Sequence, residues 1–128
     1  MRIRVSMKGF EMGSPDKTVT QTVTVAAGAS LSGASAKYSG YRLVGLCTAA
    51  TWDAANITFQ VSNDGTNFFD LTNAGTEYEV ASVTGAKAVA LDASLFIGWD
   101  YVKVRSGTSG AATKQVDDSI VTLVFYQL

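Results

Sequence analysis

The sequence predicts an all-β domain, built as an antiparallel sandwich of about eight or nine short strands. The clearest observation is a hairpin pattern in residues 57–71. There, large apolar residues alternate with polar ones, and an Asn-Asp-Gly-Thr turn at 63–66 reverses the chain. Several other short segments alternate in the same way, and turns rich in small residues separate them. No stretch carries a helical pattern of useful length, so both layers are expected to be sheets.

The first half of the chain begins with a strand of β-branched residues. Residues 18–25 alternate, with valines on one side and threonines mostly on the other. A loop of small residues covers 26–40, and residues 41–47 form a strand apolar enough to lie centrally in a sheet. Residues 49–55, around Trp52, are expected to form a loop or a single helical turn before the hairpin.

The second half contains shorter elements. Residues 77–80 and 87–91 are expected to be strands, separated by a Thr-Gly pair. Residues 92–96 have the composition of one helical turn with Asp92 as its N-cap. Residues 99–105 alternate again and are expected to form another strand.

The chain closes with a strongly apolar strand. A loop of Gly, Ser, Thr and Ala covers residues 106–114, and residues 120–126 are a nearly continuous apolar run. Such a run is typical of a strand that is covered on both faces. The one proline, Pro15, lies before residue 18, where the first strand of the sandwich domain begins. The strands of that domain therefore contain no proline, whose missing N–H would interrupt the hydrogen bonds between strands.

Composition excludes several classes of protein. The 128 residues suit one domain, and 47% hydrophobic content excludes a disordered chain. A net charge of −1 argues against a nucleic-acid partner. The single cysteine, Cys47, allows no internal disulfide and is expected to be a small buried residue. No segment resembles a membrane helix or a signal peptide, so we expect no membrane partner and synthesis in the cytoplasm.

The residues that carry chemistry are scarce. Without histidine, the commonest general base and metal ligand is missing, and no glycine-rich phosphate loop is present. Eleven carboxylates remain, and Asp64 with Asp70, or Glu77 with Glu79, are the candidates for an acid/base pair. Asp64 is needed by the turn, and a Ca²⁺ site with Asn63 and Asp70 is unnecessary to explain an Asn-Asp-Gly sequence. We expect no catalytic residue, no metal and no cofactor.

Residues 1–16 stand apart from the sandwich domain, which is expected to span residues 17–128. Apolar residues alternate with basic or polar ones at the start, and a linker-like segment follows at 9–15. One interpretation is an edge strand of the same sandwich, and the other is an arm that adds a strand to a neighbouring subunit. The interface residues of such an arm would be Arg2, Ile3, Arg4, Val5, Met7 and Lys8.

A carbohydrate site is the alternative to a purely structural role. Such sites on β-sandwiches use an aromatic plane with neighbouring amides and carboxylates. The candidate sets are Trp52 with Asp53 and Asn56, and Trp99 with Asp100 and Tyr101. The competing interpretation places Trp52 as a plug at one end of the sandwich and Trp99 as an aromatic of the core or of an edge strand.

Two resemblances narrow the fold and the role. Residues 59–71 and 101–105 look like landmark strands of the discoidin-type, galactose-binding-like jelly rolls, which implies a jelly-roll-like sandwich. Over most of residues 18–126, the sequence is similar to small virion proteins of tailed bacteriophages. Its blocks are residues 22–32, 41–46, 50–60 and 104–108. This likeness implies a particle component, and it carries over no catalytic residue.

From these observations we expect a capsid decoration (cement) protein that stabilises contacts between major capsid subunits. Its partners would be the major capsid protein or other virion proteins, and it would form a homo-oligomer, with a trimer favoured. It would be located in the virion after synthesis in the host cytoplasm. The alternative is a tail- or fibre-associated carbohydrate-binding module.

Overall fold

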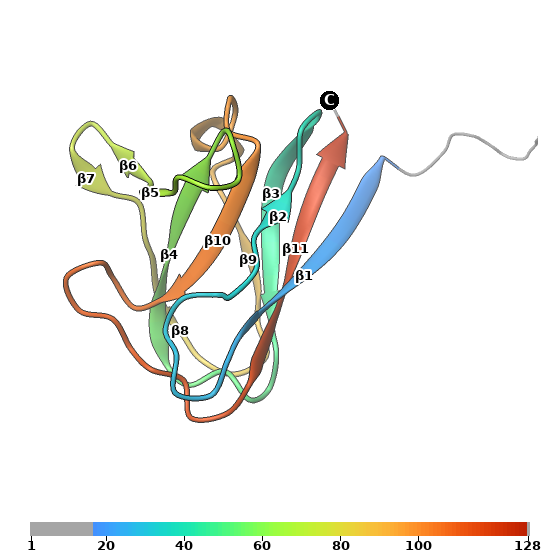
Figure 1. Ribbon diagram of the computed structural model, residues 1–128. Coiled ribbons are helices and arrows are strands. Elements are labelled where there is room, and N and C mark those ends of the chain that lie inside the picture. Colours follow the sequence, from blue (N-terminus) through green and yellow to red (C-terminus); the bar gives the residue numbers. More distant parts are fainter. Residues whose placement is uncertain (1–16, 128) are drawn as a thin grey trace, which may run out of the picture.

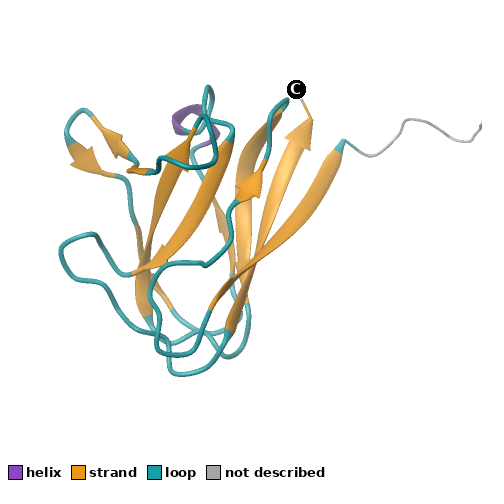
Figure 2. Ribbon diagram, viewed as in Figure 1, coloured by secondary structure: helices purple, strands orange, loops and turns teal. Residues whose placement is uncertain are grey.

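The computed structural model describes residues 17–127, which form a sandwich of two antiparallel sheets (Figure 1, Figure 2). Sheet A has the strand order β1-β11-β3-β9. The bounds are Thr18–Val25 for β1, Ser119–Gln127 for β11, Tyr41–Thr48 for β3 and Ala88–Ala90 for β9. The predicted all-β, antiparallel sandwich is therefore confirmed.

Sheet B has the strand order β2-β10-β4-β5, and β8 pairs with the beginning of β4. The bounds are Ala36–Lys37 for β2, Tyr101–Ser106 for β10, Ala55–Ser62 for β4, Phe69–Asp70 for β5 and Val80–Val83 for β8. A small hairpin of β6 (Thr72–Asn73) and β7 (Thr76–Glu77) projects beside this sheet (Figure 1).

The core lies between the two sheets because each long strand turns its apolar side inward. In β1, Val23 and Val25 are buried while Thr22 and Thr24 are exposed, as the alternation predicts. Sheet B contributes Phe59, whose ring meets that of Phe96 edge-on at 5.1 Å between centroids. Each large side chain buried in this way stabilises the fold by about 1.5–3 kcal/mol.

A single helical turn follows β9. The 3₁₀ helix η1 (Ala93–Leu95) begins after Asp92, whose Oδ1 accepts a hydrogen bond from Ser94 N at 3.1 Å. The N-cap predicted for Asp92 is confirmed, since this carboxylate satisfies an N–H that the short helix cannot. Within the described residues, no helix has the length and apolar character needed to cross a bilayer.

The predicted hairpin at 57–71 is present, with a wider connection than a tight turn. Val61 pairs with Phe69 and Gln60 with Asp70, so residues 63–68 form the loop. Leu71 is buried as expected. The two adjacent phenylalanines of this hairpin both lie outside the core, since Phe69 is 63% exposed and Phe68 is half-buried. β5 is the edge strand of sheet B.

Two other expected elements differ from the structure. The strand expected at 77–80 divides between β7 and β8, because Tyr78 N bonds to Leu71 O and its ring stacks on Phe59. The loop expected at 26–40 contains the short strand β2. That strand pairs with β10 at the edge of sheet B, a pairing between distant segments.

The closing strand β11 is covered on one face only. Val121, Leu123 and Phe125 are buried in the core, but Ile120 is 50% exposed and Tyr126 is 45% exposed. The prediction that both faces of this strand are covered is therefore wrong for the single chain. The alternate side chains of β11 lie on the outer face of sheet A, over which no other element of the described chain packs (Figure 1).

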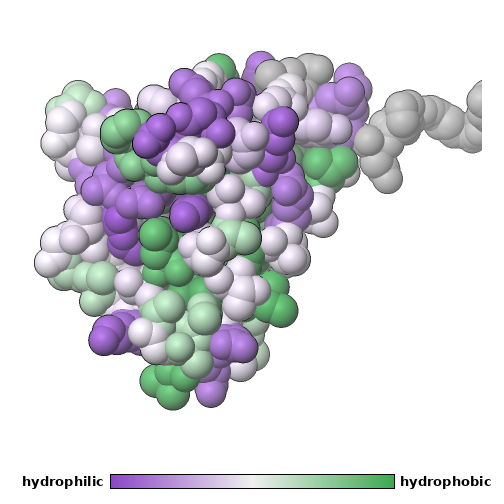
Figure 3. Space-filling view, viewed as in Figure 1, coloured by the Kyte–Doolittle hydropathy of each residue, from purple (hydrophilic) through white to green (hydrophobic). Residues whose placement is uncertain are grey.

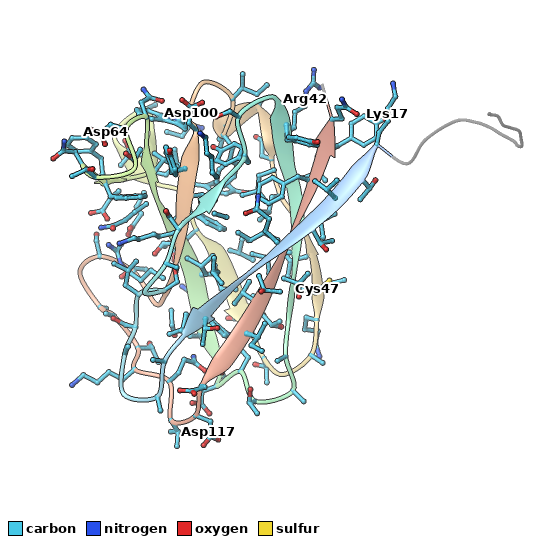
Figure 4. All side chains as sticks on the ribbon, turned by 45° about the vertical axis from the view of Figure 1, so that its right-hand side comes forward. Lys17, Arg42, Cys47, Asp64, Asp100 and Asp117 are labelled. Carbon is cyan, nitrogen blue, oxygen red and sulfur yellow. The ribbon has the colours of Figure 1, made fainter. Side chains whose placement is uncertain are left out.

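Cys47 corrects another expectation, because it is exposed rather than buried. It follows the inward-facing Leu46 on β3, so the strand alternation turns its side chain outward. In Figure 4 its sulfur projects away from the opposite sheet. The predictions for Arg2, Ile3 and the rest of residues 1–16 fall outside the described residues.

Candidate functional site

A cluster of charged side chains is centred on Arg105, on the outer face of sheet B. Arg105 is 8% exposed, and its two terminal nitrogens donate to Asp70 Oδ1 at 2.6 Å and to Glu77 Oε2 at 3.0 Å. Gln60 Nε2 also donates to Asp70 Oδ1, at 3.2 Å. The N–H and hydroxyl of Ser109 donate to Glu77 Oε1 at 3.1 and 3.2 Å. Every charge in the cluster therefore already has a partner.

This cluster fastens the β6–β7 hairpin to the sheet. Arg105 lies on β10, Asp70 on β5 and Glu77 on β7, so one guanidinium joins three elements. The hydrogen bond from Arg105 is the main cause that lowers the pKa of Asp70. A carboxyl that stays ionised in this way is a poor general acid near neutral pH. The arrangement is a clamp between strands.

The four carboxylates considered as acid/base pairs, Asp64 with Asp70 and Glu77 with Glu79, are each held by hydrogen bonds to other residues. Asp64 lies in the turn after β4, where its Oδ1 accepts hydrogen bonds from Thr66 N and Asn67 N, both at 2.8 Å. The N–H of Asn67 is the largest of the causes that hold the pKa of Asp64 well below its usual range. Within residues 17–127, no group of three or more His, Cys, Asp or Glu is placed to hold a metal ion.

The side chains of the first candidate carbohydrate set are buried or hydrogen-bonded within the sandwich itself. Trp52 is 3% exposed, so its ring offers no face on which a sugar can stack, and that interpretation of Trp52 is wrong for this structure. Asp53 Oδ2 accepts from Val116 N at 2.7 Å. Asn56 Nδ2 donates to Glu79 Oε2 at 2.7 Å, while its Oδ1 accepts from Ser82 N at 2.8 Å. These residues hold together the loops at one end of the sandwich.

The second candidate set is divided between two environments. Trp99 is half-buried and packs against the core. Tyr101 is half-buried too, and its place on β10 next to the inward-facing Val102 turns it to the outer face of sheet B. A Cβ on Gly65 would lie 3.0 Å from the Tyr101 ring, so the hairpin loop covers part of that ring. The two aromatics therefore form no common stacking surface.

Lysines accompany the aromatic rings on this face of sheet B. Lys103 Nζ lies 4.6 Å from the centroid of Phe68, and Lys37 Nζ lies 5.7 Å from that of Tyr101. Figure 3 shows strongly hydrophilic residues gathered over the upper part of the molecule, around the end of β4 and its loop. On the outer surface of sheet B, Arg105 is thus paired with carboxylates, and Lys103 and Lys37 lie over aromatic rings.

The outer face of sheet A has the opposite character. Strand register brings its outward residues into rows across β1, β11, β3 and β9. The rows are Thr18–Tyr126–Arg42, Thr20–Val124–Gly45–Ala90, Thr22–Thr122–Cys47–Ala88 and Thr24–Ile120. Among these side chains only Arg42 is charged, and it lies at the upper end in Figure 4. The centre of the face is uncharged and built of small or β-branched residues.

A buried amide that sequence reasoning missed holds the lower end together. Gln115 is 1% exposed. Its Oε1 accepts from Asp53 N at 2.7 Å, and its Nε2 donates to Ser106 Oγ at 2.9 Å and to Asp53 O at 3.2 Å. Ser119 Oγ donates to Oε1 at 3.3 Å. No local pattern marks this glutamine, because its partners lie on three separate segments.

Comparison with known proteins gives two structural neighbours. No protein-family model matches the chain, and no curated protein is significantly similar to it. The crystal structure of the SPBc2 prophage-derived protein YomS matches with a TM-score of 0.50 and 15% identity, over 88% of this chain and 97% of that one. A chain of the cyanophage Pam1 capsid asymmetric unit matches with a TM-score of 0.36 and 16% identity, over 99% and 95% of the two chains. The second score is too low to carry an argument, so the finding is that this chain is similar in fold to a prophage-derived protein.

Proposed function

We propose that the chain is a structural protein of a bacteriophage virion, and more specifically a capsid decoration (cement) protein. The observation that carries the proposal is the match of nearly the whole sandwich to a prophage-derived protein. The likeness of residues 18–126 to small virion proteins supports the same assignment. The proposed partners are the major capsid protein or other virion proteins, and the proposed location is the virion, after synthesis in the host cytoplasm.

The chemistry of the surface supports a role without catalysis. The chain has no histidine, and the carboxylates of the Arg105 cluster are occupied by ion pairs and hydrogen bonds. Apart from Arg42, the side chains on the outer face of sheet A are uncharged, and small or β-branched residues lose little rotamer freedom when they are buried in a contact. Such a surface suits packing against another protein chain.

The proposed mechanism is mechanical. A decoration protein that binds only the assembled capsid stabilises that assembly by mass action, by about 2.7 kcal/mol per site when its free concentration is 100 times the Kd. Each bound sandwich would add buried interface across a junction between capsid subunits. The capsid would then withstand a higher internal pressure before rupture.

The test uses particles of the phage that carries the gene. Gold-labelled antibodies against the purified chain should decorate heads. Heads from a deletion mutant should bind the added protein in co-sedimentation, and they should then release DNA at a higher temperature, followed with an intercalating dye. Particles that contain none of the chain, or heads that neither bind it nor gain heat resistance, would contradict the proposal.

The same particles distinguish the alternative, a tail- or fibre-associated carbohydrate-binding module. That function predicts label on tails only and a response of the tryptophan fluorescence to glycans. The burial of Trp52 weakens it, since only Trp99 then remains as a partly exposed indole.

A further inference from the structure

We infer that the outer face of sheet A binds a second copy of this chain, so that two sandwiches pack face to face. The inference rests on this sheet alone and does not depend on the proposed role in a virion. Its first support is β11, whose sequence is apolar on both sides of the strand although the single chain covers only one side. Strands of this composition are typical of sheets covered on both faces.

The charges of the face support a second copy as the partner. In a two-fold pair the same patch meets itself, so any charge near the axis would meet a like charge. The central rows contain Thr22, Thr122 and Cys47, with no charged side chain. Threonine hydroxyls both donate and accept hydrogen bonds, so two copies of such a row can satisfy each other. The face is therefore complementary to itself.

The size of the face fits a reversible pair. The three long strands have eight or nine residues, so at about 3.3 Å per residue they are about 26 Å long, and at about 4.8 Å apart they are about 14 Å wide. The fourth strand, β9, has only three residues and adds about 50 Å². The face then measures about 420 Å² per copy, or about 850 Å² in total, which is below the area of stable interfaces and fits only a weak, transient pair. We therefore expect a monomer–dimer equilibrium that depends on concentration.

The position of Cys47 provides a direct probe. It is exposed in the single chain, and its register neighbours are Thr122 on β11 and Ala88 on β9. A face-to-face pair covers this thiol. Its reaction with a maleimide should accordingly slow as the protein concentration rises.

The experiment measures the mass of the full chain by sedimentation velocity between about 1 μM and 1 mM, the range in which weak pairs dissociate. The wild type should pass from monomer to dimer. Thr22→Arg and Thr122→Arg, which place a charge at the centre of the face, should remain monomeric and should restore fast labelling of Cys47. Thr66→Arg makes the same change on the loop after β4, away from sheet A, and should dimerise like the wild type.

Circular dichroism and thermal melting of each variant will verify that the arginine variants are folded. A wild type that stays monomeric throughout, or forms an assembly other than a dimer, would overturn the inference. So would a dimer whose mass and Cys47 labelling rate are unchanged by both arginine substitutions, because another surface would then hold it together.

Discussion

Replacing Gln115 with methionine tests whether a single buried amide holds the lower end of the sandwich together. Methionine has a similar volume and reach but offers no hydrogen-bonding amide. The substitution removes the hydrogen bonds that join the side chain to Asp53, Ser106 and Ser119. Ser119 Oγ retains contacts with Asp117 O and Thr51 Oγ1, both at 3.3 Å.

The expected loss of free energy of unfolding follows from the buried polar groups that are left without partners. The N–H of Asp53 and the hydroxyl of the fully buried Ser106 lose their bonds to Gln115. Each orphaned buried group costs about 1–3 kcal/mol. We expect Gln115→Met to lower the free energy of unfolding by about 3 kcal/mol, a large part of the roughly 5–15 kcal/mol of a typical domain.

The assay is equilibrium unfolding in urea, followed by tryptophan fluorescence, because Trp52 directly precedes Asp53 in the affected loop. Gln60→Met is the matched control: Gln60 lies on the outer face of sheet B and makes one side-chain hydrogen bond, to Asp70. Its loss should cost less than about 1 kcal/mol. If the two variants lose similar stability, or if Gln115→Met loses less than about 1 kcal/mol, the buried amide does not have the role assigned to it.

Three further predictions concern pH, backbone strain and the core. The pKa of Asp70 is lower in the folded chain than its ordinary value of 3.8. Its ion pair therefore stabilises the fold fully above pH 3.8, and this stabilisation is lost as the pH falls through the lower pKa that Asp70 has in the folded chain. Asp70→Asn should therefore flatten the pH dependence of urea unfolding below about pH 4. Gly107→Ala should destabilise by more than about 1 kcal/mol, because Gly107 has φ of +88° and a Cβ there would lie 2.5 Å from a backbone oxygen. Gly110→Ala, with open space around it, should be neutral in the same thermal melt. Phe96→Ala should cost about 3–5 kcal/mol, whereas truncation of Ile97, which is 52% exposed, should cost far less.

The two outer faces of the sandwich differ in how completely their polar groups are paired. On sheet B, Arg105 and its two carboxylates satisfy one another, and Lys103 lies over Phe68. On sheet A, the exposed Ile120 and Tyr126 lie in the two outer rows. The two central rows consist of small or β-branched uncharged residues, which form no ion pairs. A surface of the second kind gains more from contact with protein than a surface whose charges are already paired.

Some predictions succeeded because the pattern behind them is local. Alternation in residues 18–25 gave β1 with the same bounds, since the side of a strand on which a residue lies depends only on its parity. Asp92 was recognised as an N-cap because the N–H that it accepts from is two residues away. The turn after β4 was recognised for the same reason, as Asp64 bonds to its own loop.

The sequence by itself thus determined the fold class, the principal strands and the scarcity of catalytic groups, all of which depend on composition and on neighbours within a few residues. Only the tertiary structure decided which distant strands pair. That pairing brings Asp70 and Glu77 to Arg105, buries Gln115 among three segments and turns Cys47 outward on a face shared with Thr122. The physical reason is that strand register is set by packing of the whole core, and a shift of one residue would move strand side chains such as Arg105 and Cys47 to the opposite face.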